Sequence, residues 1–230
     1  MRYQAALRPD DSEEHHLNSA AGGDNRGMSA DLLLASQNKG KLAEMKALVA
    51  GLPFHVLGPR DLGIDESPEE TGTTFLENAI LKARYYTQRS GGKLTVADDS
   101  GISVDALDGA PGLFSSRFGG EGATDDDRNR LLLKKLEGVP REKRTARFTS
   151  AVAVARGEDV LFTVQETVEG LIADAPKGAN GFGYDPLFFY PPYGRTFGES
   201  THADKDRVSH RGKAFARLRT FLEVLPPSSP

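Results

Sequence analysis

The stretch Thr95-Val96-Ala97-Asp98-Asp99-Ser100-Gly101-Ile102 brings an apolar run directly to two adjacent carboxylates, a hydroxyl and a glycine. This pattern predicts a strand that stops at the carboxylates, at the carboxyl end of a sheet, where charge can reach water, a metal or a phosphate. Neighbouring side chains of an extended chain point to opposite faces, so only one of Asp98 and Asp99 can face a given pocket. A solvated turn is the alternative, because Asp-Ser-Gly is ordinary turn chemistry.

A second polar loop follows the first apolar run. Leu32-Leu33-Leu34-Ala35 predicts a short buried strand, and residues 42–49 carry apolar side chains at helical spacing. Between them lies Ser36-Gln37-Asn38-Lys39-Gly40-Lys41. A strand, such a loop and a helix can hold a phosphate through backbone N–H groups, the positive helix end and a lysine. The glycine spacing differs from that of a Walker A loop, and a plain strand-to-helix connection is the alternative.

An acidic loop over residues 65–72 precedes a helix predicted at about residues 74–89. Glu70 in this loop either complements the helix dipole or serves as a hard oxygen ligand for Mg²⁺. Lys82 lies near the apolar stripe of the helix, from which it either reaches a pocket or extends to the surface.

The following part of the chain is rich in strand signals. Residues 102–107 alternate like a strand, and residues 147–156 and 160–172 predict an antiparallel hairpin. Between these regions, Thr124 and Asp127 form a capping signature for a leucine-rich helix. The sequence therefore predicts a mixed sheet rather than a purely parallel one.

A glycine-rich and aromatic loop, residues 176–186, contains Phe182, Gly183, Tyr184 and Asp185. Glycine beside an aromatic residue allows a flat ligand to lie on the ring while the backbone approaches closely. An aromatic turn that packs on the core is the alternative.

Basic residues precede the last predicted helix. Lys205 is followed by Ser209-His210-Arg211-Gly212, in which Ser209 is a plausible N-cap. His210 and Arg211 then fall in the first turn, where positive charge opposes the helix dipole. Their placement indicates a ligand, although structural or exposed roles are the alternative.

The composition excludes several classes of protein. The chain has no cysteine, and therefore no thiolate nucleophile, disulfide or cysteine-based zinc site. Its net charge of −4 argues against a nucleic-acid-coating protein, and no apolar run reaches the roughly 20 residues needed to cross a membrane. We expect a cytoplasmic protein with a flexible extension at residues 1–30 and a frayed tail at residues 226–230.

Taken together and in this order, the motifs resemble the inosine triphosphate pyrophosphatase family, also called the Ham1-like family, over about residues 32–222. The resemblance rests on Ser36-Gln37-Asn38-Lys39-Gly40-Lys41, Glu70-Thr71-Gly72 with residues 75–79, Ala97-Asp98-Asp99-Ser100-Gly101, Gly109-Ala110-Pro111-Gly112, residues 181–186 and Ser209-His210-Arg211-Gly212. Gln37 departs from the small residue that is usual in the family.

The resemblance implies an α/β fold with an elongated mixed central sheet flanked by helices. It further implies one domain, residues 31–225, of two lobes with a nucleotide cleft between them, usually as a homodimer. The implied reaction is Mg²⁺-dependent hydrolysis of ITP, dITP and XTP to the monophosphate and pyrophosphate. A purine nucleoside triphosphate is the implied partner, with neither nucleic acid nor membrane.

The family match also implies roles for individual residues. Asp99 is the expected general base and, with Glu70, the expected Mg²⁺ ligand. The phosphates are expected at Ser36, Gln37, Asn38, Lys39, Gly40, Lys41 and Lys82. The rest of the substrate is expected at Ser100, Phe182, Gly183, Tyr184, Asp185, Lys205, His210 and Arg211, with Phe182 stacked on the purine.

Two other functions are considered. A Maf-like pyrophosphatase of different specificity is disfavoured by residues 182–185 and by His210-Arg211, because that group carries different motifs. A nucleotide-binding regulator without catalysis is disfavoured by the presence of Asp99, Glu70 and the two lysines Lys41 and Lys82.

Overall fold

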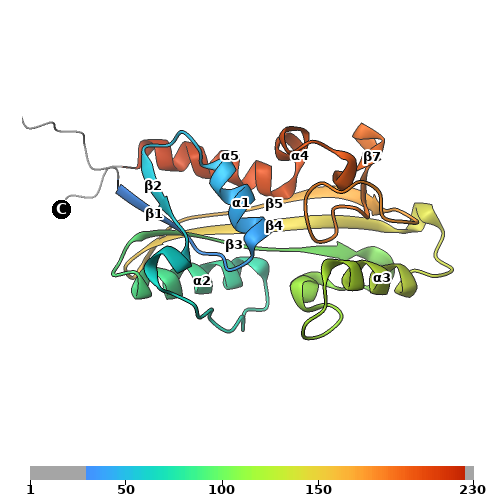
Figure 1. Cartoon of the computed structure of the whole chain (residues 1–230), viewed down its shortest axis with the longest axis horizontal. Coiled ribbons are helices and arrows are strands. Elements are labelled where there is room, and N and C mark those ends of the chain that lie inside the picture. Colours follow the sequence, from blue (N-terminus) through green and yellow to red (C-terminus); the bar gives the residue numbers. More distant parts are fainter. Residues whose placement is uncertain (1–29, 226–230) are drawn as a thin grey trace, which may run out of the picture.

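A seven-stranded sheet in the order β2-β1-β3-β4-β5-β6-β7 forms the centre of residues 30–225, the part of the chain that the computed structural model describes (Figure 1). The strands are β1 (Ala30–Leu34), β2 (Phe54–Leu57), β3 (Leu94–Val104), β4 (Thr145–Arg156), β5 (Asp159–Ile172), β6 (Phe188–Tyr190) and β7 (Arg195–Thr196). The pairs of β1 with β2 and β3 are parallel, and every pair from β3 to β7 is antiparallel. The predicted mixed α/β class is confirmed.

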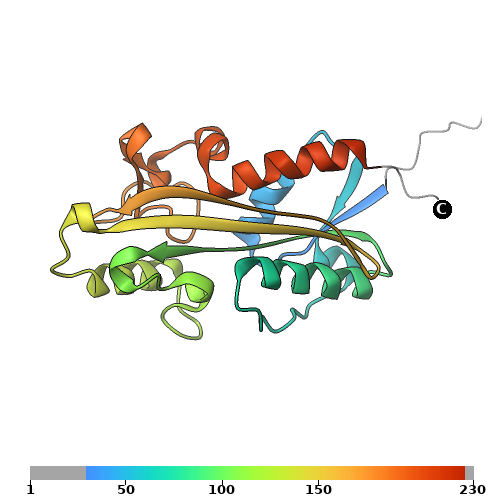
Figure 2. The same cartoon turned by 180° about the vertical axis from the view of Figure 1, so that it is seen from behind.

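Helices cover both faces of the sheet (Figures 1 and 2). They are α1 (Lys39–Leu48), α2 (Phe75–Arg89), α3 (Asp125–Lys135), α4 (His202–Val208) and α5 (His210–Val224). In both views α1, α4 and α5 lie on one face of the long strands, and α2 and α3 lie on the other. A short 3-10 segment, η3 (Gly112–Arg117), connects β3 toward α3.

The expected strand end at Asp98-Asp99 is wrong. Strand β3 continues through both carboxylates to Val104 and pairs with β4 from Thr95 onward, and residues 105–107 form a 3-10 turn rather than more strand. The carboxylates can lie inside a sheet because each has a polar partner on its own face, as described below. Gly101 is required for a close approach rather than a turn, because a Cβ there would overlap Gly112 O and Ser115 Oγ of η3.

Alternation along β3 explains the two layers that flank the sheet. Leu94 and Val96 belong to the apolar cluster beneath α1 and α5, whereas Ala97 belongs to the cluster beneath α2. By the same alternation, Asp98 follows the first face and Asp99 follows the second. A third cluster, around Ile102, Val104, Leu132, Phe148 and Phe188, lies at the other end of the long strands.

Capping residues fix where the helices begin. Thr74 and Thr124 each form a capping box, with Glu77 and Asp127. Asn38 caps α1 and Ser209 caps α5, each accepting a backbone N–H three residues later. The predicted starts of α2, α3 and α5, including the Ser209 cap, are confirmed within a residue, whereas α1 begins three residues earlier than predicted, at Lys39 inside the expected loop.

The expected flexible extension lies outside the described residues except for Ala30, which begins β1, and the expected frayed tail lies outside them entirely. Within residues 30–225, no helix combines the length and apolar character needed to cross a membrane.

Candidate active site

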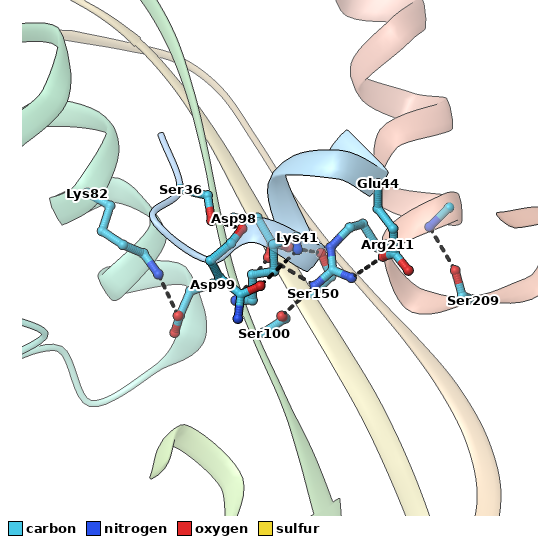
Figure 3. Close-up of polar contacts among 12 residues, drawn as sticks. Ser36, Lys41, Glu44, Lys82, Asp98, Asp99, Ser100, Ser150, Ser209 and Arg211 are labelled. Atoms are coloured by element: carbon cyan, nitrogen blue, oxygen red, sulfur yellow. Dashed lines mark hydrogen bonds and ion pairs between the residues drawn. The ribbon is translucent and has the colours of Figure 1, made fainter. Parts of the chain in front are cut away.

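Asp98 and Asp99 lie in the middle of β3 and point in opposite directions (Figure 3). Asp98 faces α1 and α5, where it meets Lys41 and Arg211. Asp99 faces α2, where it meets Lys82. The sheet therefore separates the two carboxylates into two different charged groups, as the alternation of an extended chain requires.

Asp98 is a buried counter-ion that joins three elements. Its Oδ2 atom lies 3.2 Å from Lys41 Nζ and 3.2 Å from Arg211 Nη2, and Ser150 Oγ on β4 donates to its Oδ1. Burial favours the neutral acid, but the charges of Arg211 and Lys41 outweigh it and hold the pKa of Asp98 well below its ordinary value. Asp98 thus stays ionised and fixes both basic side chains.

Asp99 belongs to a more open group. Lys82 Nζ lies 2.6 Å from Asp99 Oδ1 and 3.1 Å from Glu70 Oε1, so both carboxylates meet at one ammonium. Arg117 of η3 contacts the other oxygen of Glu70 at 2.9 Å, and Asn78 Nδ2 lies 3.4 Å from Asp99 Oδ2. Burial opposes the charge on Lys82, but the two carboxylates raise its pKa above the ordinary value.

The donor set around Lys82 suits a hard divalent cation. The oxygens of Glu70 and Asp99 already converge on one positive charge, and Mg²⁺ is commonly held by one or two carboxylates together with substrate phosphates. Among residues 30–225 no group of three or more His, Cys, Asp or Glu could bind a metal. Substrate phosphates and water would supply the remaining ligands.

A fourth carboxylate, Glu44 of α1, organises the other basic residues. Its two oxygens lie 2.7 Å from Lys205 Nζ and 2.6 Å from Arg211 Nη1. Lys205 Nζ also lies 2.5 Å from Asp185 Oδ2. Burial opposes the charge on Lys205, but Asp185 and Glu44 outweigh it and raise the pKa of this lysine. The arrangement fixes Lys205 and Arg211 in a protein interior.

A cavity of about 130 Å³ opens beside these residues. It is lined by Asn38, Lys41, Ser100, Gly101, Ser115, Ser116, Asp125, Arg128, Phe148, Phe182, Gly183, Tyr184, Asp185, Lys205, His210 and Arg211. The first turns of α1, α3 and α5 all contribute, so three positive helix ends border the same space. The cavity therefore favours an anionic ligand.

Phe182 supplies the aromatic surface of this cavity. Its ring centroid lies 5.2 Å from Lys205 Nζ and 5.6 Å from Arg211 Cζ. The ring also lies against Gly40, where an added Cβ would come within 2.8 Å of Phe182 Cδ1. Phe182 therefore links the base of α1 with the loop that precedes β6.

His210 is a neutral residue of the cavity wall. Burial, together with the charges of Arg211 and Lys205, holds its pKa well below the ordinary value. Its ring stacks on Phe148 with centroids 4.7 Å apart, and its Nδ1 is buried with no protein partner within residues 30–225. A neutral imidazole offers one donor and one acceptor rather than a charge.

The sequence comparisons identify the relatives of this site. A model of the Ham1 family matches residues 32–221. The chain belongs to this family. The dITP/XTP pyrophosphatase of Xanthomonas oryzae pv. oryzae is 46% identical over 196 residues, which cover 84% of this chain and 98% of that protein. The dITP/XTP pyrophosphatase of Haemophilus influenzae is 45% identical over 197 residues, which cover 85% of this chain and 100% of that protein.

Solved structures of Ham1 proteins share the fold. The HAM1 protein from Coxiella burnetii superposes with a TM-score of 0.75 at 40% identity, covering 84% of this chain and 98% of that one. The nucleoside-triphosphatase/dITP/XTP pyrophosphatase from Mycobacterium abscessus superposes with a TM-score of 0.65 at 42% identity, covering 82% and 98%.

The structure brings most of the sequence-predicted residues together, although not all in one cavity. Glu70, Lys82 and Asp99 form the open group beside the cavity. Ser36 is buried next to the start of α1, and Lys39 and Gly40 begin that helix. The remaining substrate residues line the cavity, except Gln37, whose Nε2 donates to Ile64 O at 3.0 Å.

Several residues of this Ham1 site were missed in the sequence. They are Glu44, Asn78, Arg117, Asp125 and Ser150, which hold predicted residues in place. Glu44 follows Lys41 by three residues on α1, a spacing that places both on one helix face and could have indicated it. The others are brought to the site by pairing and packing of distant segments, which no local pattern encodes.

Proposed function

We propose that this Ham1-family protein hydrolyses ITP, dITP and XTP to the nucleoside monophosphate and pyrophosphate, and so removes deaminated purines from the nucleotide pool. The observation that carries the proposal is that one cavity contains both the Phe182 ring with its buried cations and Ser100, the neighbour of Asp99. The printed names of the relatives from Xanthomonas oryzae and Haemophilus influenzae agree with this chemistry.

The buried cations account for the preference for a 6-oxo purine over adenine. Lysine and arginine side chains have donors and no acceptors, and Lys205 and Arg211 are held in a nearly dry site. The 6-oxo group of a deaminated purine accepts a hydrogen bond, whereas the 6-amino group of adenine would leave a donor unpaired. A buried mismatch of this kind can discriminate by roughly 10⁴-fold or more.

Asp99 is the group we assign to activation of water. Lys82 and Asn78 fix its two oxygens. A positioned carboxylate can take the proton of a water molecule that attacks the α-phosphorus. Lys41, Lys82 and the first turn of α1 would stabilise the negative charge of the triphosphate as the bond to pyrophosphate breaks.

We assign the divalent metal, Mg²⁺ in this proposal, to Glu70 and Asp99. When bound with substrate, the ion would neutralise part of the triphosphate charge. The convergence of both carboxylates on Lys82 supports the assignment, because it shows that these oxygens stabilise a positive charge at one point.

We further propose that residues 31–225 act as one domain of two lobes and that the protein works as a homodimer in the cytoplasm. Light scattering of the purified protein tests the dimer directly. A monomeric mass at working concentration would contradict this part and leave the chemistry untouched.

A nucleotide panel tests the proposed function. With Mg²⁺, pyrophosphate release from ITP, dITP and XTP should far exceed release from ATP, GTP and the pyrimidine triphosphates. Equal rates on ATP and ITP would contradict the specificity, and orthophosphate as the sole product would contradict the bond assignment. Binding without turnover of any nucleotide would favour the regulatory alternative.

A further inference from the structure

The loop that carries Phe182 depends on α3 for its conformation. Gly183 has a left-handed backbone with φ of 62°, a region that glycine enters without strain. Its N–H donates to Asp125 Oδ2 at 2.7 Å, and its carbonyl accepts from Asn129 Nδ2 at 3.0 Å. Asp125 and Asn129 are four residues apart on α3 and so lie on one helix face. Both polar groups of one loop residue are therefore satisfied by a single helix.

These contacts fix the direction of the Phe182 ring. The peptide group before Phe182 is held by Asp185, whose Oδ2 accepts the Phe182 N–H at 2.9 Å. The peptide group after Phe182 carries the Gly183 N–H that Asp125 accepts. Because the two peptide planes that flank a Cα define its φ and ψ, Asp185 and Asp125 together set the backbone of Phe182. Asn129 holds the next peptide group along the chain.

The helix dipole does not by itself explain why an acidic residue stands at position 125. The first turn of α3 contains three acidic residues, and Asp127 already completes the capping box with Thr124. Asp126 is exposed and offers the dipole the same charge. Asp125 differs from both, because it reaches across to Gly183 and is held in place by Arg128 Nη2 at 2.5 Å.

We infer that Asp125, supported by Asn129, is a positioning residue for purine binding in this protein. The side chain acts through the Gly183 peptide, which holds the Phe182 ring over Lys205 and Arg211. The inference about ligand binding rests on the proposed function, whereas the inference about the loop conformation does not.

The loop conformation can be measured without a ligand. The chain has no tryptophan, so Phe182→Trp introduces a single fluorescent reporter at the ring position. In this background, Asp125→Ala should shift the emission to the red and increase quenching by acrylamide. Asp125→Asn keeps an oxygen acceptor and should restore the parent signal, and Asp126→Ala is the matched control for helix charge.

Measurements of ligand binding distinguish a positioning role of Asp125 from a general loss of protein structure. In the protein that retains Phe182, without the tryptophan reporter, Asp125→Ala should weaken binding of inosine 5′-monophosphate by about tenfold. The reason is that base–aromatic stacking is partly lost. Binding of Mg²⁺-pyrophosphate should stay within about twofold, since Lys41 and Lys82 are held by Asp98 and Asp99 of β3. Asn129→Ala should give a smaller loss, because its bond lies one peptide group farther from Phe182.

An unchanged reporter in Asp125→Ala would overturn the inference. So would equal losses of inosine monophosphate and pyrophosphate binding, or an Asp125→Asn variant as weak as Asp125→Ala. If Asp125→Ala does not fold, Asn129→Ala carries the same test. Equal binding of inosine and adenosine monophosphates by the unaltered protein would instead contradict the proposed function, and the fluorescence result would still decide the loop conformation.

Discussion

The two groups of charged residues on either side of Ser100 differ in their access to water. In the group around Glu44, the side chains of Lys205 and Arg211 are 4% and 3% exposed. In the group around Glu70, the side chains of Lys82 and Arg117 are 12% and 50% exposed. Both groups pair acids with bases at similar distances. They differ in the exposure of their bases and of Glu70, which is 24% exposed, whereas Glu44 and Asp99 are both largely buried.

This difference matches two different tasks. A buried group of ion pairs is rigid. A donor that the pairs leave free, such as Arg211 Nε, which has no protein partner within residues 30–225, has no access to water and can recognise a base by its hydrogen-bonding edge. An open group can exchange one cation for another, because water compensates for the broken pairs. The comparison therefore predicts that equivalent substitutions in the two groups will have different consequences for stability and for activity.

The largest effect is expected at Asp99. Asp99→Asn keeps the shape of the side chain but removes the base, so kcat should fall by about 10³-fold or more while the melting temperature changes little. Steady-state kinetics and calorimetry measure the two quantities. Asp65→Asn, in an exposed loop, is the control. Turnover close to that of the unaltered enzyme would remove Asp99 from the proposed role.

The next effect is expected at Glu44, in the buried group. Glu44→Gln leaves Lys205 and Arg211 short of a counter-charge, which should lower the free energy of unfolding by about 3 kcal/mol. Burial alone would raise the pKa of Glu44, but Arg211 and Lys205 lower it, which indicates how strongly the pairs favour the ionised acid. Denaturant titration measures the loss. A variant as stable as the unaltered protein would contradict the assigned rigidity.

Glu70→Gln should differ from Glu44→Gln, because it should affect activity more than stability. Unfolding free energy should change by no more than about 1 kcal/mol, because the group is partly solvated. The Mg²⁺ concentration for half-maximal activity should rise by about tenfold or more. A magnesium titration compared with that of Glu69→Gln, at the exposed neighbouring residue, measures this effect. An unchanged titration would exclude Glu70 as a metal ligand.

The smallest effect concerns His210 and pH. Its pKa is depressed by burial, so below about pH 6.5 the unfolded chain binds a proton that the folded protein does not. Stability should therefore fall by about 1.4 kcal/mol for each pH unit below 6.5, until the folded pKa is reached. His210→Gln should reduce this dependence of stability on pH, whereas substitution of the exposed His202 should leave the dependence unchanged. A slope that persists in His210→Gln would contradict the buried neutral imidazole.

The sequence predicts the layers of the fold because those layers follow local periodicity. The α2 pattern, the capping boxes at Thr74 and Thr124, and the hairpin of β4 and β5 are all encoded within a few residues. The end of β3 is not encoded in this local way. Two adjacent aspartates favour a turn when read alone, and only Lys41, Lys82 and Arg211 from distant segments make them compatible with a central strand.

The same limit applies to the site. Sequence motifs indicated Lys205 and, through their placement against a helix dipole, His210 and Arg211 as ligand-binding residues. The structure adds that Glu44 and Asp98 neutralise two of these charges. Such pairing joins α1, β3, α4 and α5 through tertiary contacts, so the counter-ions could not be assigned from spacing along the chain.

Hydrolysis of ITP in H₂¹⁸O reports which phosphorus atom the water attacks. It therefore tests directly whether the protein cleaves the bond between the α-phosphate and pyrophosphate. Mass spectrometry of the products locates the label. We expect ¹⁸O in the inosine monophosphate and none in the pyrophosphate, since Asp99 directs water to the α-phosphorus. Label in the pyrophosphate, or labelled orthophosphate with inosine diphosphate, would contradict it.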